Sequence, residues 1–342
     1  MHQAVRRAGR SYNDSVCIVT SHLLREPAGT CPARQRARVF RKSVTLLLSV
    51  AWTSLRVGRR AWYSLSGRNP IVRGRHAPTL QEEWRAVRGL SVGGGQAAQT
   101  GSDAEGRTLW NTWMGDMWMP PGTAAHTVAM LASEMRANIY ALTGREKVLL
   151  DCGANVGFFS RYAFLRGAER VVAFEPSPGN AACLRKNLAK ELADGRLLII
   201  DKGVWNEDTV LSFDSGNAQN PGGHHISETQ QGNIQIQVTS IDRLRADVNL
   251  DRLDYIKMDV EGAERRALQG ALQTIRALRP RLCVATEHTE DLYANACAVI
   301  QQIQEIDGGY DYVCTESHGY QSPSQGRVLT PYSVRFEPAG SH

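Results

Sequence analysis

The chain has 342 residues, of which 42% are hydrophobic, so it is long enough to bury one large core or one core with an extension. Its seven cysteines are scattered without a CxxC pair, which argues against a disulfide framework and a structural zinc site and favours a reducing, cytoplasmic environment. The net charge of +6 is uneven, because residues 1–75 carry 15 Lys and Arg against two acids, which leaves −7 for residues 76–342.

Residues 1–75 are expected to form a basic, poorly ordered extension with a short apolar helix near residues 43–55. This uncharged stretch has 13 residues, fewer than the ~20 that a membrane-spanning helix needs. Basic residues flank it, so a helix over residues 41–62 that rests on an anionic membrane surface or on a partner is an alternative. A transit peptide is a further alternative, although residues 1–40 show no clean amphipathic period.

Residues 76–122 are expected to lead into the main domain. A Gly-rich linker or loop at 91–103 is followed by a Trp-rich run at 110–118. Such a run is typical of a short β-hairpin packed on the core, and the alternative is an aromatic wall over a bound substrate. Apolar residues at helical spacing predict a helix over 123–143.

The rest of the chain, residues 123–342, alternates strand and helix patterns. This alternation predicts a doubly wound α/β domain, with a mostly parallel sheet and helices on both faces. Residues 210–213 and 234–238 are expected to pair as a hairpin around a loop at 215–233. Strands are expected at 147–151, 171–175, 197–201, 255–259, 282–287, 310–315 and 332–337, and helices at 158–166, 180–193, 263–278 and 290–305.

The segment DCGANVG, residues 151–157, leaves the first strand through a tight turn and enters a helix. Gly153 and Gly157 lack the Cβ that would collide with a ligand lying close to the backbone. Asn155 tolerates the left-handed conformation that such turns often require. A dinucleotide fingerprint would need glycines at 153, 155 and 158, and the residues Asn155 and Phe158 exclude it. Asp151 is placed to meet the cationic end of a bound cofactor.

An acid and a short polar run follow the next two strands. Glu175 lies 24 residues after Asp151, where a carboxylate can accept hydrogen bonds from both hydroxyls of a ribose. Asp201, Lys202 and Gly203 follow the third strand, where the edge of an adenine ring is expected. Together with the Gly-rich loop, these residues predict a site for S-adenosylmethionine.

The stretch from Asn111 to Glu287 resembles the FkbM family of S-adenosylmethionine-dependent methyltransferases. The family's hallmarks stand here as DCGANVG (151–157), FEP (174–176) and DYIKMDVEGAE (254–264), and LRPRLCVATEH (278–288) resembles the strand that follows. The resemblance implies a class I methyltransferase fold with a seven-stranded sheet. It also implies a methyltransferase that acts on a hydroxyl of a sugar, a glycan, a polyketide or another secondary metabolite.

The segment after the fourth strand is the expected catalytic centre. Asp259 is the leading candidate for orienting the acceptor or removing its proton, and Glu261 either shares this role or bonds the backbone across the turn. Lys257 has the same strand parity as Asp259 and is expected to pair with an acid. Glu264 lies in the first turn of the next helix, where the helix dipole favours an acid. His288, after the fifth strand, is a candidate general base or a polar residue at the rim.

Other arrangements stay open at this point. Chemistry without a metal is expected, and the alternative is a divalent ion held by Asp259, Glu287 and His288 in the manner of catechol-type methyltransferases. His224 and His225 are further candidates for contact with the acceptor. An RNA methyltransferase that binds phosphate through its basic N-terminus is an alternative function. The net charge of −7 and the missing Asn/Asp-Pro-Pro-aromatic element argue against it, so no nucleic-acid partner is expected. A non-catalytic, cofactor-binding scaffold is the remaining alternative.

Overall fold

The computed structural model describes residues 97–217, 220–227, 234–314, 317–322 and 326–340. The expectations for residues 1–75, including the helices near 43–55 and 41–62, lie outside this part of the chain. Among the described residues, no helix combines the length and the apolar character that crossing a membrane requires.

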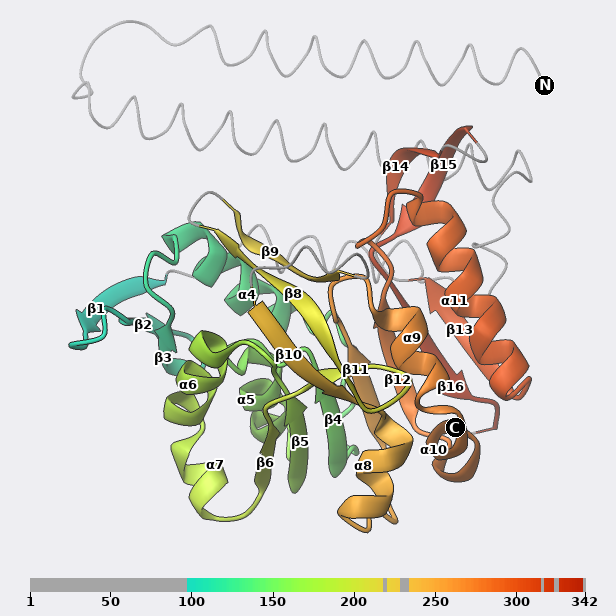
Figure 1. Ribbon diagram of the computed structural model, residues 1–342, viewed down its shortest axis with the longest axis horizontal. Helices are drawn as coiled ribbons and strands as arrows, with labels where there is room; N and C mark the ends of the chain where they lie inside the picture. The colour runs from blue at the N-terminus through green and yellow to red at the C-terminus, as the bar shows by residue number, and fades with distance from the viewer. Residues whose placement is uncertain (1–96, 218–219, 228–233, 315–316, 323–325, 341–342) are drawn as a thin grey trace, which may run out of the picture. The chain divides into compact units, whose positions relative to one another are not determined.

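Seven strands form the central sheet, in the order β13-β16-β12-β11-β4-β5-β6 (Figure 1). The last strand in sequence, β16, runs antiparallel to both of its neighbours, whereas β12, β11, β4, β5 and β6 run parallel to one another. This topology confirms the predicted mostly parallel, seven-stranded sheet. The strands are β4 (Val148–Cys152), β5 (Arg170–Phe174), β6 (Leu197–Ile200), β11 (Tyr255–Met258), β12 (Arg281–Ala285), β13 (Tyr310–Cys314) and β16 (Ser333–Pro338).

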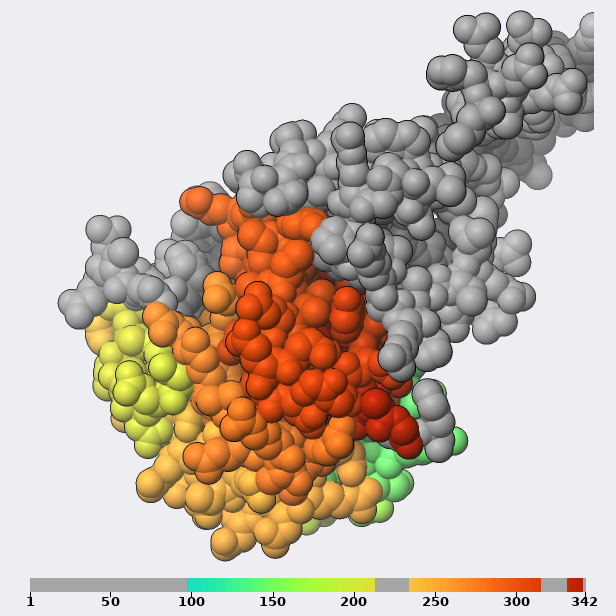
Figure 2. Space-filling model, turned by 90° about the vertical axis from the view of Figure 1, so that its right-hand side faces the viewer, coloured from blue at the N-terminus to red at the C-terminus, as the bar shows by residue number. Residues whose placement is uncertain are grey.

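Alternate residues of these strands are buried on opposite faces of the sheet. Leu149 and Val171 face a core built with α4 (Ala125–Ala137), α5 (Phe158–Leu165) and α6 (Pro178–Asn187). Leu150 and Val172 face a second core, and all four side chains are 0% exposed. Burial of such a side chain stabilises the fold by roughly 1.5–3 kcal/mol. The second core is built with α8 (Ile241–Asp247), α9 (Glu264–Gln269), α10 (Leu272–Leu278) and α11 (Leu292–Ile306). Figure 2 views the domain from the side of α11, where the C-terminal elements, in orange to red, form the centre of the surface.

Two predicted helices are each divided in two. The helix predicted over 180–193 is α6 followed by α7 (Ala189–Ala193), and the helix predicted over 263–278 is α9 followed by α10. The second break falls at Gly270, where an added Cβ would lie 2.2 Å from the backbone oxygen of Trp205. This close backbone contact explains why glycine stands at the break.

The Trp-rich run forms the predicted hairpin, β2 (Thr108–Thr112) with β3 (Gly115–Met119). The adjoining part of the predicted linker is instead a third strand, β1 (Ala98–Ser102), because its backbone pairs with β2. Asn187 anchors the hairpin to the domain: its Oδ1 accepts a hydrogen bond from the backbone N–H of Trp118 at 2.6 Å, and its Nδ2 donates to the Trp118 oxygen at 3.0 Å.

A second, four-stranded sheet has the order β7-β10-β8-β9. The predicted pairing of residues 210–213 with 234–238 is confirmed, since Phe213 lies opposite Ile234. The prediction of a loop over residues 215–233 was wrong in part, because residues within this range form β9 and pair with β8. A further hairpin near the C-terminus was not predicted. The strands concerned are β7 (Gly203–Val204), β8 (Thr209–Asn217), β9 (Asn220–Ser227), β10 (Ile234–Thr239), β14 (Ser317–Ser322) and β15 (Gly326–Pro331).

Candidate active site

An open cavity lies at the carboxyl ends of β4, β5 and β11, the edge at which α/β sheets of this kind bind their ligands. It holds about 980 Å³ of non-protein space, including its open mouth. The predicted site residues that line it are Gly153, Asn155, Glu175, Gly203, Asp259 and Glu261. The predicted residues outside its wall are Asp151, Gly157, Asp201, Lys202 and His288.

The loop after β4 requires glycine for a reason that the sequence did not reveal. Gly153 has φ +79°, and an added Cβ would lie 1.9 Å from the backbone oxygen of Asp259. Gly157 has φ +93°, and its Cβ would lie 2.6 Å from Leu184 Cδ1. At Gly153 a backbone contact within the protein already excludes a side chain, whereas at Gly157 the positive φ and the end of the Leu184 side chain disfavour one. Asn155 has φ 51°, as expected for a left-handed turn.

Asp151 lies behind the cavity wall and is 0% exposed. Its Oδ2 accepts a hydrogen bond from Ser160 Oγ at 2.6 Å, and its Oδ1 lies 3.4 Å from Lys257 Nζ. The same ammonium lies 3.7 Å from Asp259 Oδ2 and donates to the backbone oxygen of Gly153 at 2.6 Å. The predicted pairing of Lys257 with an acid is therefore confirmed. Burial favours the neutral amine, but Asp151 and Asp259 together raise the pKa of Lys257 above its usual range.

Glu175 lies in the cavity wall with 5% of its surface exposed. Its Oε2 accepts a hydrogen bond from the backbone N–H of Asn155 at 2.7 Å, and its Oε1 accepts from the backbone N–H of Ser177 at 2.9 Å. Burial raises the pKa of Glu175 to about 7, although these bonds favour the charged form. Oε1 also accepts a hydrogen bond from Asn180 Nδ2 at 3.4 Å, so the acceptor capacity left for a ligand in the cavity lies mainly on Oε2.

Of the residues that follow β6, Asp201 and Lys202 do not reach the cavity. The side chain of Asp201 is exposed and forms an ion pair with Arg185. Lys202 is half-buried, and neither side chain lines the cavity. Gly203 and Val204, which follow, do line it.

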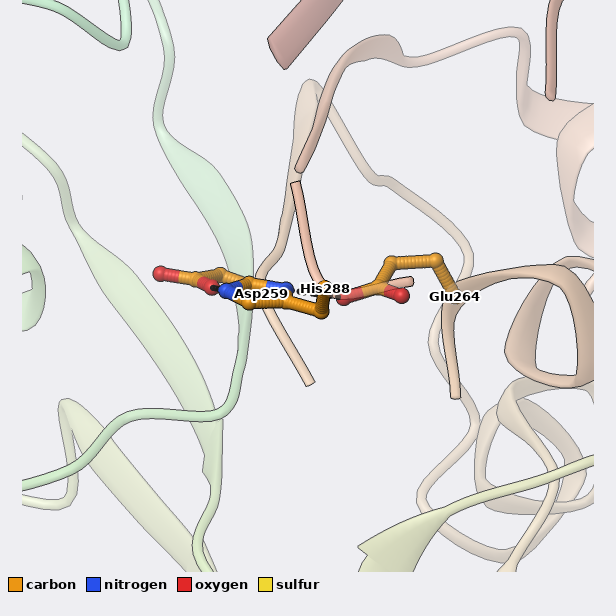
Figure 3. A group of neighbouring side chains, drawn as sticks. All are labelled: Asp259, Glu264 and His288. Carbon is orange, nitrogen blue, oxygen red and sulfur yellow. Dashed lines mark hydrogen bonds and ion pairs between the residues drawn. The ribbon is translucent and has the colours of Figure 1, made fainter. Parts of the chain in front are cut away.

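Four titratable side chains meet where β11 and β12 end. His288 Nε2 lies 3.7 Å from Asp259 Oδ1 and 3.5 Å from Glu261 Oε2, and its Nδ1 lies 3.1 Å from Glu264 Oε1. Figure 3 shows the His288 ring between Asp259 and Glu264. Burial lowers the pKa of His288, but the hydrogen bond to Glu264 and the charges of the three acids raise it to about 9. Burial raises the pKa of Glu261 to about 7, with His288 opposing and Asp259 adding to this shift.

Glu264 lies in the first turn of α9, as predicted, but its contacts with the other members of this cluster were not predicted. It is 1% exposed, and its Oε1 accepts hydrogen bonds from the backbone N–H groups of Val260 and Gly262. The carboxylate that bonds the backbone across the turn is therefore Glu264 and not Glu261. The sequence offered one signal for these contacts, namely the spacing from Asp259 to Glu264, which places an acid in the first turn of the following helix.

In the alternative set of metal ligands, Glu264 replaces Glu287. Among the described residues, the ligand atoms that lie within 4.8 Å of one another belong to Asp259, Glu264 and His288. Glu287 is exposed and is not part of this group. Glu264, from the first turn of α9, takes its place.

Further lining residues come from α4 and from aromatic side chains, namely Leu131, Glu134, Met135, Tyr140, Phe158 and Phe159. None of the tryptophans of the hairpin lines this cavity, so its lining gives no support to the alternative of a Trp wall. Trp110 is buried in the core, and Trp113 Nε1 donates to the backbone oxygen of Ala132 at 2.6 Å. The side chains of His224 and His225 lie outside the described part of the chain.

The seven-stranded sheet, with one antiparallel strand and a cavity at the ends of β4 and β5, defines an α/β domain of the methyltransferase class. The chain belongs to the FkbM methyltransferase family, since the model described as "Methyltransferase FkbM domain" matches residues 151–321.

Two curated relatives are similar to this chain. One is "2-O-methyltransferase NoeI" of Sinorhizobium fredii, 27% identical over an alignment of 167 residues that covers 43% of this chain and 66% of the relative. The other is "Hexuronic acid methyltransferase AglP" of Haloferax volcanii, 26% identical over 133 residues, which are 39% of this chain and 53% of the relative. The match thus covers about two thirds of the first relative and about half of the second. A solved structure, "Methyltransferase FkbM" from Methylobacillus flagellatus KT, is 21% identical with a TM-score of 0.39, and the match covers 56% of this chain and 44% of that one.

Proposed function

We propose that this protein is an S-adenosylmethionine-dependent methyltransferase that methylates a hydroxyl group of a sugar or glycan. The observation that carries the proposal is one cavity that joins a buried carboxylate, Glu175, to an acidic pair, Asp259 and Glu261. Membership of the FkbM family supports the reaction. The printed names of the relatives, a 2-O-methyltransferase and a hexuronic acid methyltransferase, support the class of acceptor.

The donor half of the site fits the cofactor. In this proposal Glu175 accepts hydrogen bonds from the ribose hydroxyls, and the backbone of Gly203 and Val204 borders the adenine. Asp151 acts from behind the wall by holding Lys257, which fixes the backbone oxygen of Gly153. Asp259 and Glu261 give the cavity a negative wall that suits a sulfonium. When bound, S-adenosylmethionine supplies a methyl group whose bond to sulfur breaks as the acceptor oxygen bonds to it in line, with the bonding pair left on sulfur.

The acceptor half divides the work between two carboxylates. Lys257 holds Asp259 at 3.7 Å, so Asp259 is suited to orient the acceptor hydroxyl. Glu261 takes the hydroxyl proton, because a pKa of about 7 is suited to a general base near neutral pH. His288 lies 3.5 Å from Glu261 and favours its ionised form, so that the carboxylate is ready to accept the proton.

The test is transfer of a labelled methyl group from S-adenosylmethionine to a panel of saccharides that includes hexuronic acids. The proposal expects a labelled methoxy product and an equal amount of S-adenosylhomocysteine. Label on nitrogen acceptors alone would contradict oxygen methylation. Tight cofactor binding without turnover on any acceptor would favour the non-catalytic scaffold. Turnover lost in EDTA and restored by Mg²⁺ would favour the divalent-ion alternative.

A further inference from the structure

One oxygen of Glu264 connects three parts of the acceptor half. Glu264 Oε1 accepts hydrogen bonds from the backbone N–H of Val260 at 3.1 Å and of Gly262 at 3.3 Å. The same oxygen lies 3.1 Å from His288 Nδ1. The side chain is 1% exposed and does not line the cavity, so it contacts the residues of the site without facing a substrate.

The turn that Glu264 bonds has an unusual backbone. Glu261 has φ 53°, a left-handed conformation that residues other than glycine adopt only when their surroundings enforce it. Gly262 follows with φ +98°, and an added Cβ would lie 3.2 Å from the backbone oxygen of His288. The two hydrogen bonds to Glu264 enclose Glu261 from both sides. They therefore hold the turn that presents the Glu261 side chain to the cavity.

The contact with Glu264 also decides which nitrogen of the His288 ring faces the cavity residues. Glu264 Oε1 already accepts from two backbone N–H groups and therefore meets His288 Nδ1 as an acceptor, which makes Nδ1 the donor of this contact. The other ring nitrogen, Nε2, is then directed at Asp259 and Glu261, as Figure 3 shows for Asp259. A carboxylate behind a histidine fixes the orientation of the ring and, once the ring is neutral, also its tautomer.

We propose that Glu264 is a positioning residue for the acceptor half of the site. It orients His288 and holds the turn between Asp259 and Gly262, so that Asp259, Glu261 and His288 Nε2 converge on the acceptor hydroxyl. This inference rests on the proposed function, because the acceptor hydroxyl belongs to that reaction. Lys257, Asp259 and Glu261 are the other charged groups that face His288 or the turn from the adjoining elements.

The test variant is Glu264→Gln, whose amide oxygen can still accept from Val260 and Gly262. The matched control is Asp242→Asn, because Asp242 also accepts from two backbone N–H groups, those of Gln273 and Thr274, but does not line the cavity. In Glu264→Gln, kcat should fall about 10- to 100-fold, and the Kd for S-adenosylmethionine should stay within about twofold. The alkaline limb of the pH profile should move about one unit lower. Asp242→Asn should change none of these quantities.

A second measurement needs no acceptor and separates this inference from the proposed function. Nitrogen-15 NMR of His288, assigned with His288→Asn, should show a proton on Nδ1 in the wild type and a titration about one unit lower in Glu264→Gln. If the wild type transfers no methyl group, the proposed function fails, and the role of Glu264 toward an acceptor fails with it; a His288 titration that still moves in Glu264→Gln would show that the orienting contact itself exists. If the wild type is active but Glu264→Gln keeps its kcat and its His288 titration, Glu264 is only a structural acid.

Discussion

Replacement of Glu175 by glutamine should weaken cofactor binding without weakening the fold. The carboxylate is 5% exposed, and burial raises its pKa from 4.5 to about 7. A raised carboxyl pKa means that this group stabilises the fold only in its protonated form. Its contribution is complete below pH 4.5 and is lost as the pH rises to about 7. The lost contribution is about 3 kcal/mol, since one pKa unit corresponds to about 1.4 kcal/mol.

Glutamine removes this penalty but introduces another. Its single amide oxygen can face the N–H of Asn155 or of Ser177, so one of these donors loses a partner at a cost of about 1–3 kcal/mol. The two effects offset each other, and the unliganded protein should keep its Tm within a few degrees at pH 8. Cofactor binding should still suffer, because one acceptor for a ribose hydroxyl is gone. A charge-assisted hydrogen bond of about 1.5–3 kcal/mol corresponds to a Kd about 10- to 150-fold weaker.

Isothermal titration of S-adenosylhomocysteine into the wild type and Glu175→Gln measures this change. Asp201→Asn is the control, because Asp201 is exposed and paired with Arg185, and its Kd should remain within about twofold of the wild type. An affinity of Glu175→Gln within about threefold of the wild type would refute the assignment of Glu175. So would a loss of affinity that appears only together with unfolding.

Two further predictions follow from the cluster and from the loop. The value of kcat/KM should rise as the pH increases through about 7, where Glu261 loses its proton, and should fall above about 9, where His288 loses its proton. Initial rates measured from pH 6 to 10 test this, and a flat profile would contradict it. Gly153→Ala should lower the free energy of unfolding in urea by at least ~2 kcal/mol, because the added Cβ would lie 1.9 Å from the backbone oxygen of Asp259. The control is Gly122→Ala, at φ +80° with no atom within 4 Å, which should cost about 1 kcal/mol. Equal losses of unfolding free energy in the two variants would contradict the explanation from contacts.

The fold was predictable from the sequence where the signals were local. Apolar runs followed by Gly153 or Glu175 located β4 and β5 within one residue, and their order indicated a parallel sheet. The Gly-, Asn- and His-rich composition of residues 215–233 concealed β9, because its pairing with β8 depends on backbone contacts rather than on an apolar pattern. The break at Gly270 was also hidden, since its cause is the backbone of Trp205, far away in sequence.

The site was predictable in the same partial way. The segments that carry Glu175, Asp259 and Glu261 were identifiable because each follows a strand that ends at the same edge of the sheet. The environment of Glu264 was not, because its contact with His288 spans 24 residues and two elements. Asp201 shows the reverse error: it also follows a strand, but Arg185 on α6 binds its side chain outside the cavity. The functional roles of these residues stay predictions for the experiments above.

A crystal structure of the protein with S-adenosylhomocysteine bound tests the central claim most directly. The account predicts that both ribose hydroxyls lie within hydrogen-bond distance of the Glu175 carboxylate. It also predicts that the sulfur faces the wall formed by Asp259 and Glu261. A cofactor bound away from Glu175, or with its sulfur turned from Asp259 and Glu261, would contradict the account.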